Sequence, residues 1–406
     1  MTNKYNKTVF ACCISYVTQA IVANFAPLLF VQFSKQYSVS LSQISLLIFI
    51  CFGVQLIVDA IAAYLNDRID HRKVAILSQV SAIIGIAGFT FFPRLLPSPF
   101  LGLIVAELFA GIGGGLMEVI ISPIIEACPA TNKTGRMSLL HSFYSWGQAI
   151  TVLLTTVVLH LIGVENWWVM ALVWTAVPLT SIILFTFVPI PQASKENAFD
   201  NTSLSENKSS FSGLFKTPLF YLFVVVMLCS GAAELSMAQW TSSFAETGLG
   251  VSKAIGDILG PCLFAITMGS ARLIFARVSA HSGTVSFLIL SSALCIASYL
   301  ITALSPIPLI ALFGCALCGF SVGAMWPGAL SLAASRVSDS VACFALMAMA
   351  GDLGAMIGPA MTGAIAEALG GNIGHAYLFS LIFPVVLFVI FTIRFKRNST
   401  GEGAKR

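Results

Sequence analysis

Three carboxylates interrupt a long apolar stretch of this chain, residues 100–126. Glu107 and Glu118 lie 11 residues apart, and Glu126 ends the stretch. An ionised group in hydrocarbon costs at least about 2.5–3.5 kcal/mol on insertion scales, so residues of this kind usually serve a function. At about 100° per residue, the spacing returns Glu107 and Glu118 to nearly the same helix face. The pattern predicts a membrane helix with a proton-binding or polar-contact face.

Two glycines, Gly111 and Gly115, lie between these carboxylates and would let a neighbouring helix approach closely. A structural alternative stays open for both acids. Each glutamate could be hydrogen-bonded to a neighbouring helix and take no part in function, and this alternative is stronger for Glu107 than for Glu118.

The composition is that of an integral membrane protein. Charged residues make up 9% of the 406 residues, against about 25% in soluble domains, and hydrophobic residues make up 57%. The basic residues are spread over loops, so we expect no nucleic-acid partner. All 10 cysteines fall inside or at the ends of apolar segments, and we interpret them as buried apolar residues. We expect no metal site and no cofactor.

At about 20 apolar residues per span, the sequence predicts twelve transmembrane helices. They are expected at 8–33, 43–65, 74–95, 99–127, 137–162, 166–189, 217–240, 254–276, 284–304, 307–333, 340–369 and 375–395. The polar, Ser- and Asn-rich run from Pro191 to Ser212 is the one long linker. The predicted domains are an N-terminal six-helix bundle (1–189), a cytoplasmic linker (190–216) and a C-terminal six-helix bundle with a short cytoplasmic tail (217–406).

The distribution of Lys and Arg predicts the orientation. With the N-terminus inside, 18 of the 21 basic residues fall on the inner side, and only Lys35, Arg94 and Lys253 fall outside. We therefore expect a multi-pass protein of the cell (inner) membrane with both termini in the cytoplasm. A monomer is expected, because each half can pack against the other. Asp257 and Glu367 lie near outer helix ends, where we expect both to be solvated.

The loop after the second span carries Asp67-Arg68 and, four residues on, Arg72. This loop resembles the G-x-x-x-D-R-x-G-R-R/K motif of the major facilitator superfamily. Ala63, Asp70 and His71 depart from that pattern. The resemblance implies two six-helix bundles, an all-α membrane fold, and a conformational latch formed by Asp67, Arg68 and Arg72.

The fourth span supports a narrower resemblance. Its run from Gly113 to Pro123, with Glu118 and Ser122 inside, is similar to the G-x-G-x-x-E-x-x-x-N-P of the fucose-permease-like sugar/proton symporters. Glu107 stands where the superfamily often has arginine. The seventh span adds a Gly-x-x-Glu…Trp spacing, and the first span, around Asn24, lacks the aspartate that the fucose permease uses.

Helical spacing on the fifth span places three polar residues on one face: His141, Ser145 and Gln148. A polar face on a membrane helix should point at protein or water. We predict that the substrate-binding residues are Asn24, His141, Ser145, Gln148, Glu234, Gln239, Trp240 and Trp326. Proton coupling is predicted for Glu118, Glu107 and Asp352.

These features predict a transporter that works by alternating access, not an enzyme. We expect it to carry a small polar solute, a sugar, together with protons, at a site near the bilayer midplane. The alternative is a proton-driven exporter of lipophilic compounds or drugs, which would use Glu107 or Asp352. The polar face of the fifth span favours the first. A polytopic membrane enzyme is disfavoured, because the chain shows no nucleotide-binding loop and no nucleophile elbow.

Overall fold

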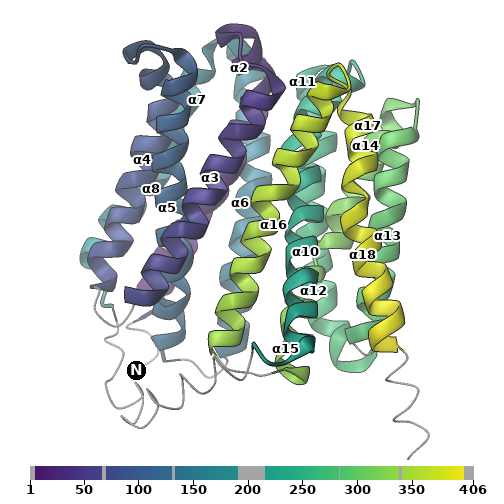
Figure 1. The fold of residues 1–406 in the computed structure, drawn as a ribbon. Coiled ribbons are helices and arrows are strands. Elements are labelled where there is room, and N and C mark those ends of the chain that lie inside the picture. The colour runs from purple at the N-terminus through teal and green to yellow at the C-terminus, as the bar shows by residue number, and fades with distance from the viewer. Residues whose placement is uncertain are drawn as a thin grey trace, which may run out of the picture. The chain divides into compact units, whose positions relative to one another are not determined.

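The computed structural model describes residues 5–65, 70–129, 133–190, 215–282, 284–337 and 341–396. Within these ranges the regular elements are helices (Figure 1). Eleven helical segments of the described part are long and apolar enough to cross a membrane. The helix α16 (Val341–Ala368) adds a further segment of 28 residues. The predicted all-α membrane fold with twelve helices is therefore confirmed.

The helices that correspond to the first six predicted spans are α1 (Asn6–Asn24) with η2 (Ala26–Leu29) and α2 (Phe30–Tyr37), α3 (Leu41–Leu65), α4 (His71–Leu95), α5 (Pro99–Ala127), α6 (Lys133–Ile162), and η4 (Val164–Asn166) with α7 (Trp167–Trp174) and α8 (Ala176–Phe187). The remaining ones are α10 (Pro218–Ser243) with η5 (Phe244–Gly248), α11 (Lys253–Asp257) with η6 (Ile258–Cys262) and α12 (Leu263–Ser282), α13 (Thr284–Leu304), α14 (Pro308–Val322) with α15 (Met325–Arg336), α16, and α17 (Ile373–Ser380) with α18 (Ile382–Ile390) and η7 (Phe391–Lys396).

Contacts between residues divide the chain into two compact units. Unit 1 comprises Met1–Gln192 and Gln239–Ala265, and unit 2 comprises Ala193–Ala238 and Ile266–Arg406. The end of the seventh helix and the start of the eighth thus pack with the first six helices. Most of the predicted linker lies outside the described residues, and the division of the chain at that linker stays a prediction.

In unit 1 the first span is broken by Pro27, which lies in the 3₁₀ turn η2 between α1 and α2. Proline has no backbone N–H, so it cannot donate a helical hydrogen bond to the carbonyl of Ala23, four residues earlier. The Nε2 of Gln239 donates to that carbonyl instead, at 3.0 Å. The break in the first helix therefore creates an attachment point for the end of α10.

The helix α5 begins where its sequence favours a start. Ser98 accepts the backbone N–H of Leu101 at 3.2 Å, and Pro99 occupies the first helical turn, where no N–H is needed. A Cβ added at Gly111 or Gly115 would meet the backbone carbonyl of Cys51 or Gln55 on α3, at 2.5 and 2.8 Å. These two glycines therefore let α3 approach closely, as their spacing predicts.

In unit 2 glycines bring α10 and α16 into backbone contact. A Cβ on Gly231 would lie against the carbonyl of Gly351, and one on Gly354 would lie against the carbonyl of Leu228. The hydroxyl of Tyr299 on α13 donates to the Ala233 carbonyl of α10 at 2.7 Å. The helix α10 is thus fixed on two sides by contacts that involve its main chain.

Asp70 caps the start of α4, because its Oδ1 accepts the backbone N–H groups of Arg72 (3.0 Å) and Lys73 (3.3 Å). The Lys73 hydrogen bond is the largest of the effects that hold the pKa of Asp70 below its ordinary value. Because the pKa of Asp70 is lowered in the folded state, its carboxylate stabilises the start of α4 at pH values above its ordinary pKa of about 3.9. This stabilisation is lost as the pH falls through the lowered pKa.

We therefore expect hydrogen-exchange protection of the first turn of α4 to fall on acidification in the wild type. Asp70→Asn keeps the acceptor oxygen and should keep partial protection that does not change with acid. Asp70→Ala should remove the protection at every pH. An acid-dependent loss of protection that persists in Asp70→Ala would contradict this role of the carboxylate.

Candidate functional site

Glu118 is the centre of a polar cluster inside unit 1. Its Oε2 accepts a hydrogen bond from the Nε2 of Gln55 on α3, at 2.8 Å. Gln55 is only 6% exposed and Gln19 of α1 is only 7% exposed. A Cβ added at Gly114 would lie 2.7 Å from the Oε1 of Gln55 and 3.4 Å from the Oε1 of Gln19. One amide, from α3, therefore binds the carboxylate, and a second, from α1, lies against the preceding turn of α5.

A second group of polar side chains lies one turn further along α5. The hydroxyl groups of Tyr16 and Ser122 are 3.1 Å apart and hydrogen-bonded. The ring of Tyr16 also packs edge-on against the imidazole of His141, with 5.4 Å between centroids. Because Ser122 is four residues from Glu118, both groups share one face of α5. Carboxylate, amide, hydroxyl and imidazole groups thus gather between α1, α3, α5 and α6.

The sequence indicated three of these residues and missed three. Glu118, Ser122 and His141 stand out from the motif and from helical spacing. Gln55, Tyr16 and Gln19 were not singled out, although two amides inside apolar spans are an available signal.

Glu107 lies on the same side of α5 as Glu118. It is 4% exposed and lines the same small cavity as Cys51 of α3. Cys51 and Gln55 are four residues apart on α3, so the two glutamates face successive turns of one helix. This confirms the shared face that their spacing predicts. A cavity of about 10 Å³, close to the size of one water, lies beside Glu107. Its other walls include Val22, Phe30, Ile48, Phe52 and Gln239.

Two of the three residues predicted to share the polar face of the fifth helix are enclosed by the structure. Ser145 is 1% exposed and Gln148 is 3% exposed, while Trp146, next to Ser145, is 43% exposed. The close contact of Gly147 with Ala20 and Val17 fixes this face of α6 against α1. His141, the third residue of the predicted face, is exposed, so the structure encloses the part of this face around Ser145 and Gln148 but not all of it.

Three further predicted residues lie near the break in the first helix. The Asn24 amide donates to the Ala20 carbonyl of its own helix at 2.9 Å. Gln239 holds the Ala23 carbonyl, and Trp240, fully buried, packs on Phe30 with 5.5 Å between ring centroids. These groups join the end of α10 to α1 and α2.

Three predicted residues, Glu234, Asp352 and Trp326, belong to unit 2. Glu234 on α10 pairs with Arg272 on α12 at 3.8 Å, and both side chains are partly enclosed. Asp352 is 8% exposed. The ring of Trp326 covers the neighbouring Gly351, where a Cβ would collide with it. An arginine partner for Glu234 was not expected from the sequence.

The predicted latch is only partly described. Asp67 and Arg68 lie outside the described residues. The guanidinium of Arg72 donates to the carbonyls of Thr186 and Val188, both at 2.8 Å, and to that of Phe185. These carbonyls end α8 and have no partners further along the helix. Arg72 therefore caps the sixth span, a contact that loop motifs do not reveal.

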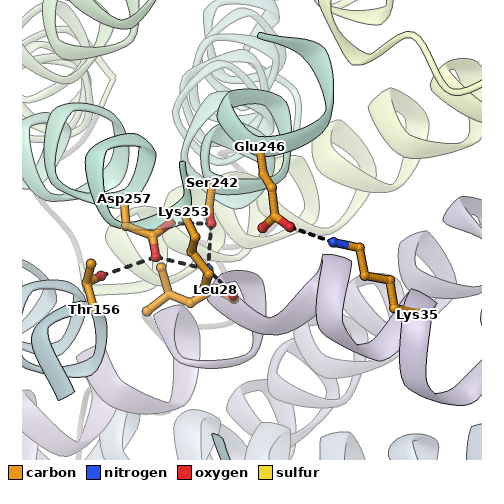
Figure 2. A network of polar contacts seen from close by, with 7 residues as sticks. All are labelled: Leu28, Lys35, Thr156, Ser242, Glu246, Lys253 and Asp257. Atoms are coloured by element: carbon orange, nitrogen blue, oxygen red, sulfur yellow. Dashed lines mark hydrogen bonds and ion pairs between the residues drawn. The ribbon is translucent and has the colours of Figure 1, made fainter. Parts of the chain in front are cut away.

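The expectation for Asp257 is wrong, whereas Glu367 is exposed as expected. Asp257 is 1% exposed and forms an ion pair with Lys253 at 2.9 Å (Figure 2). It also accepts hydrogen bonds from Thr156 of α6 and Ser242 of α10. The i,i+4 spacing of Lys253 and Asp257 is the signal that predicts this pairing.

Comparison with known proteins agrees with this architecture. Residues 8–350 match the family model of the Major Facilitator Superfamily. No curated protein sequence matches the chain. Among solved structures, the D-xylose-proton symporter superposes with a TM-score of 0.77 at 14% identity, covering 96% of this chain and 97% of that chain.

Two other solved structures are similar. The E. coli fucose:proton symporter has a TM-score of 0.66 at 16% identity, with 96% of this chain and 99% of that chain covered. The nucleoside transporter NupG has a TM-score of 0.77 at 13% identity, with 96% and 100% covered. These identities support the fold alone. The family match spans most of the sequence, and the chain belongs to the Major Facilitator Superfamily of transporters.

Proposed function

We propose that this transporter carries a sugar together with protons, and that Glu118 is the proton carrier. The observation that supports this most directly is the hydrogen bond between Glu118 and Gln55, beside Tyr16, Ser122 and His141. A sugar presents hydroxyl groups that both donate and accept. Carboxylate, amide, hydroxyl and imidazole groups can satisfy the hydrogen bonds of such a solute.

The coupling follows from the pairing of Glu118. A carboxylate in a membrane interior is unfavourable unless it is neutralised by a proton or solvated by polar partners. Gln55 offers only one N–H to it in this structure. Hydroxyl groups of a bound sugar would add donors, so binding of the sugar and the charge state of Glu118 would be linked.

Two similar solved structures carry names that agree with this proposal. One is described as a fucose:proton symporter and another as a D-xylose-proton symporter. We further propose that both termini face the cytoplasm of the cell membrane, from the charge asymmetry of the loops, and that the protein works as a monomer.

The test uses purified protein in proteoliposomes with a pH-sensitive dye outside the vesicles. Hexoses, deoxyhexoses and amino sugars are added one at a time. We expect at least one of them to cause external alkalinisation and to be exchanged in counterflow. No response to any sugar, together with proton movement driven by lipophilic cations, would contradict the proposal.

The second candidate function is proton-driven export of lipophilic compounds. It is favoured by one observation, the mainly apolar walls around Glu107. The same vesicle assay separates the two, because an exporter of this kind would respond to lipophilic cations and lose that response in Glu107→Gln.

A further inference from the structure

Three membrane helices depart from regular α-helical geometry near the polar network formed by Lys253, Asp257, Ser242, Thr156 and the Leu28 carbonyl. The first has the 3₁₀ turn η2, the seventh ends in the π-helical turn η5, and the eighth contains the π-helical turn η6 with Pro261. Interrupted membrane helices expose carbonyls and side chains that can coordinate cations. All of these segments belong to unit 1.

The ammonium of Lys253 finds an acceptor for each of its three N–H groups. It lies 2.9 Å from the Oδ2 of Asp257, donates to the Leu28 carbonyl of η2, and contacts the Ser242 hydroxyl at 3.4 Å (Figure 2). Three donors is the full capacity of a lysine ammonium. The acceptors come from three separate helices, α11, η2 and α10.

The carboxylate of Asp257 is equally well paired. Its Oδ2 also accepts the Thr156 hydroxyl of α6 at 3.1 Å, and its Oδ1 accepts the Ser242 hydroxyl. Apolar contacts enclose the network, since Leu28, Cys262, Ala149 and Val152 belong to one buried cluster. The charges are thus held away from water by side chains of the helices that they join.

A second lysine–carboxylate pair nearby provides a comparison. Lys35 and Glu246 also lie 2.9 Å apart, and this pair joins α2 to the end of the seventh helix (Figure 2). Their side chains are 67% and 22% exposed, whereas those of Lys253 and Asp257 are 13% and 1% exposed. Exposed pairs contribute little to stability, but removal of one partner from a buried pair leaves an uncompensated charge.

We propose that Asp257, Ser242 and the Leu28 carbonyl form a binding site for a primary ammonium group, that Lys253 occupies it as a tethered cation, and that this occupancy holds the Gln239–Cys262 segment on α1 and α6. Opening of these helix ends requires the ammonium to leave three acceptors together. The inference goes beyond the proposed transport function, because it does not depend on which solute is carried.

The test is hydrogen exchange of the full-length protein in lipid nanodiscs, followed in peptides from the Gln239–Cys262 segment and from residues 23–33. In Lys253→Ala we expect exchange of both regions to accelerate at least about tenfold, the scale expected when a buried pair is broken. Methylammonium fits the vacated site, so it should restore slow exchange. Choline at the same ionic strength is too large and should not.

The exposed pair gives the matched control. Lys35→Ala is expected to change exchange by less than about twofold and to be indifferent to methylammonium. Methylammonium should also leave the exchange of the wild type unchanged, because Lys253 already occupies the site there. Unchanged exchange in Lys253→Ala, or equal recovery with choline, would overturn the proposal.

A further variant keeps the inference testable if Lys253→Ala does not fold. Lys253→Met with Asp257→Asn removes both charges and leaves a neutral, similarly sized pair. We expect this double variant to exchange more slowly than Lys253→Met alone, because no buried charge is left unpaired. Equally fast exchange in Lys253→Met and in the double variant would show that pairing of the Lys253 and Asp257 charges does not hold the Gln239–Cys262 segment in place.

Discussion

Glu118→Gln is expected to abolish sugar-driven proton movement and to leave sugar counterflow intact. The new amide oxygen can still accept the hydrogen bond that Gln55 donates at 2.8 Å, so the packing between α3 and α5 should survive. An amide cannot bind or release the coupled proton. With one proton per sugar, each unit of pH gradient supports about tenfold accumulation of sugar. In the variant, the sugar concentrations on the two sides of the membrane should become equal, a ratio of about one.

Glu107→Gln is the matched control for this experiment. It changes a second carboxylate on the same face of α5, which lines a small cavity together with Cys51. We expect this variant to keep sugar-dependent alkalinisation and accumulation. Coupling that persists in Glu118→Gln would contradict the proposed carrier, and its loss in Glu107→Gln instead would assign that role to Glu107.

The helices themselves could be predicted closely, because apolar length and local end signals determine them. The fourth and ninth spans, 99–127 and 284–304, have the bounds of α5 and α13. Ser98 and Pro99 mark the start of α5 by chemistry that depends on neighbouring residues alone.

Helix breaks were harder to predict than helix spans. Pro27 is visible in the sequence, but the first span was predicted as continuous. Whether a proline breaks a membrane helix depends on what satisfies the freed carbonyl, and here that group is the Gln239 amide, 216 residues from Ala23. Such a long-range partner cannot be found from local sequence.

In the candidate site, too, the sequence predicts the features that depend on one helix alone and misses those that depend on contacts between helices. Spacing alone placed Glu107 and Glu118 on one face, because a helix has a fixed period. Their neighbours on α3, Cys51 and Gln55, depend on how α3 is placed along α5, which the carbonyl contacts at Gly111 and Gly115 fix. The sequence indicates that a close approach occurs there, but it does not identify the side chains that meet across it.

Gly354→Ala is expected to destabilise the protein strongly, although alanine is the better helix former. The added Cβ would lie on the Leu228 carbonyl of α10 and 2.9 Å from the backbone nitrogen of Ala232. Backbone atoms cannot turn aside as a side chain can, so α10 and α16 would have to separate. We expect a loss of about 3 kcal/mol, the upper range for overpacking, and a lower Tm in detergent.

Gly328→Ala is the control, with the same chemical change in another helix of unit 2. There the added Cβ would meet the Cδ2 of Leu288 at 2.8 Å, the end of a side chain that can change rotamer. The gain in helix propensity, up to about 1 kcal/mol, should then offset the contact, and Tm should stay the same or rise. If Gly354→Ala is as stable as Gly328→Ala, the backbone contact between α10 and α16 is not the close approach that the structure shows.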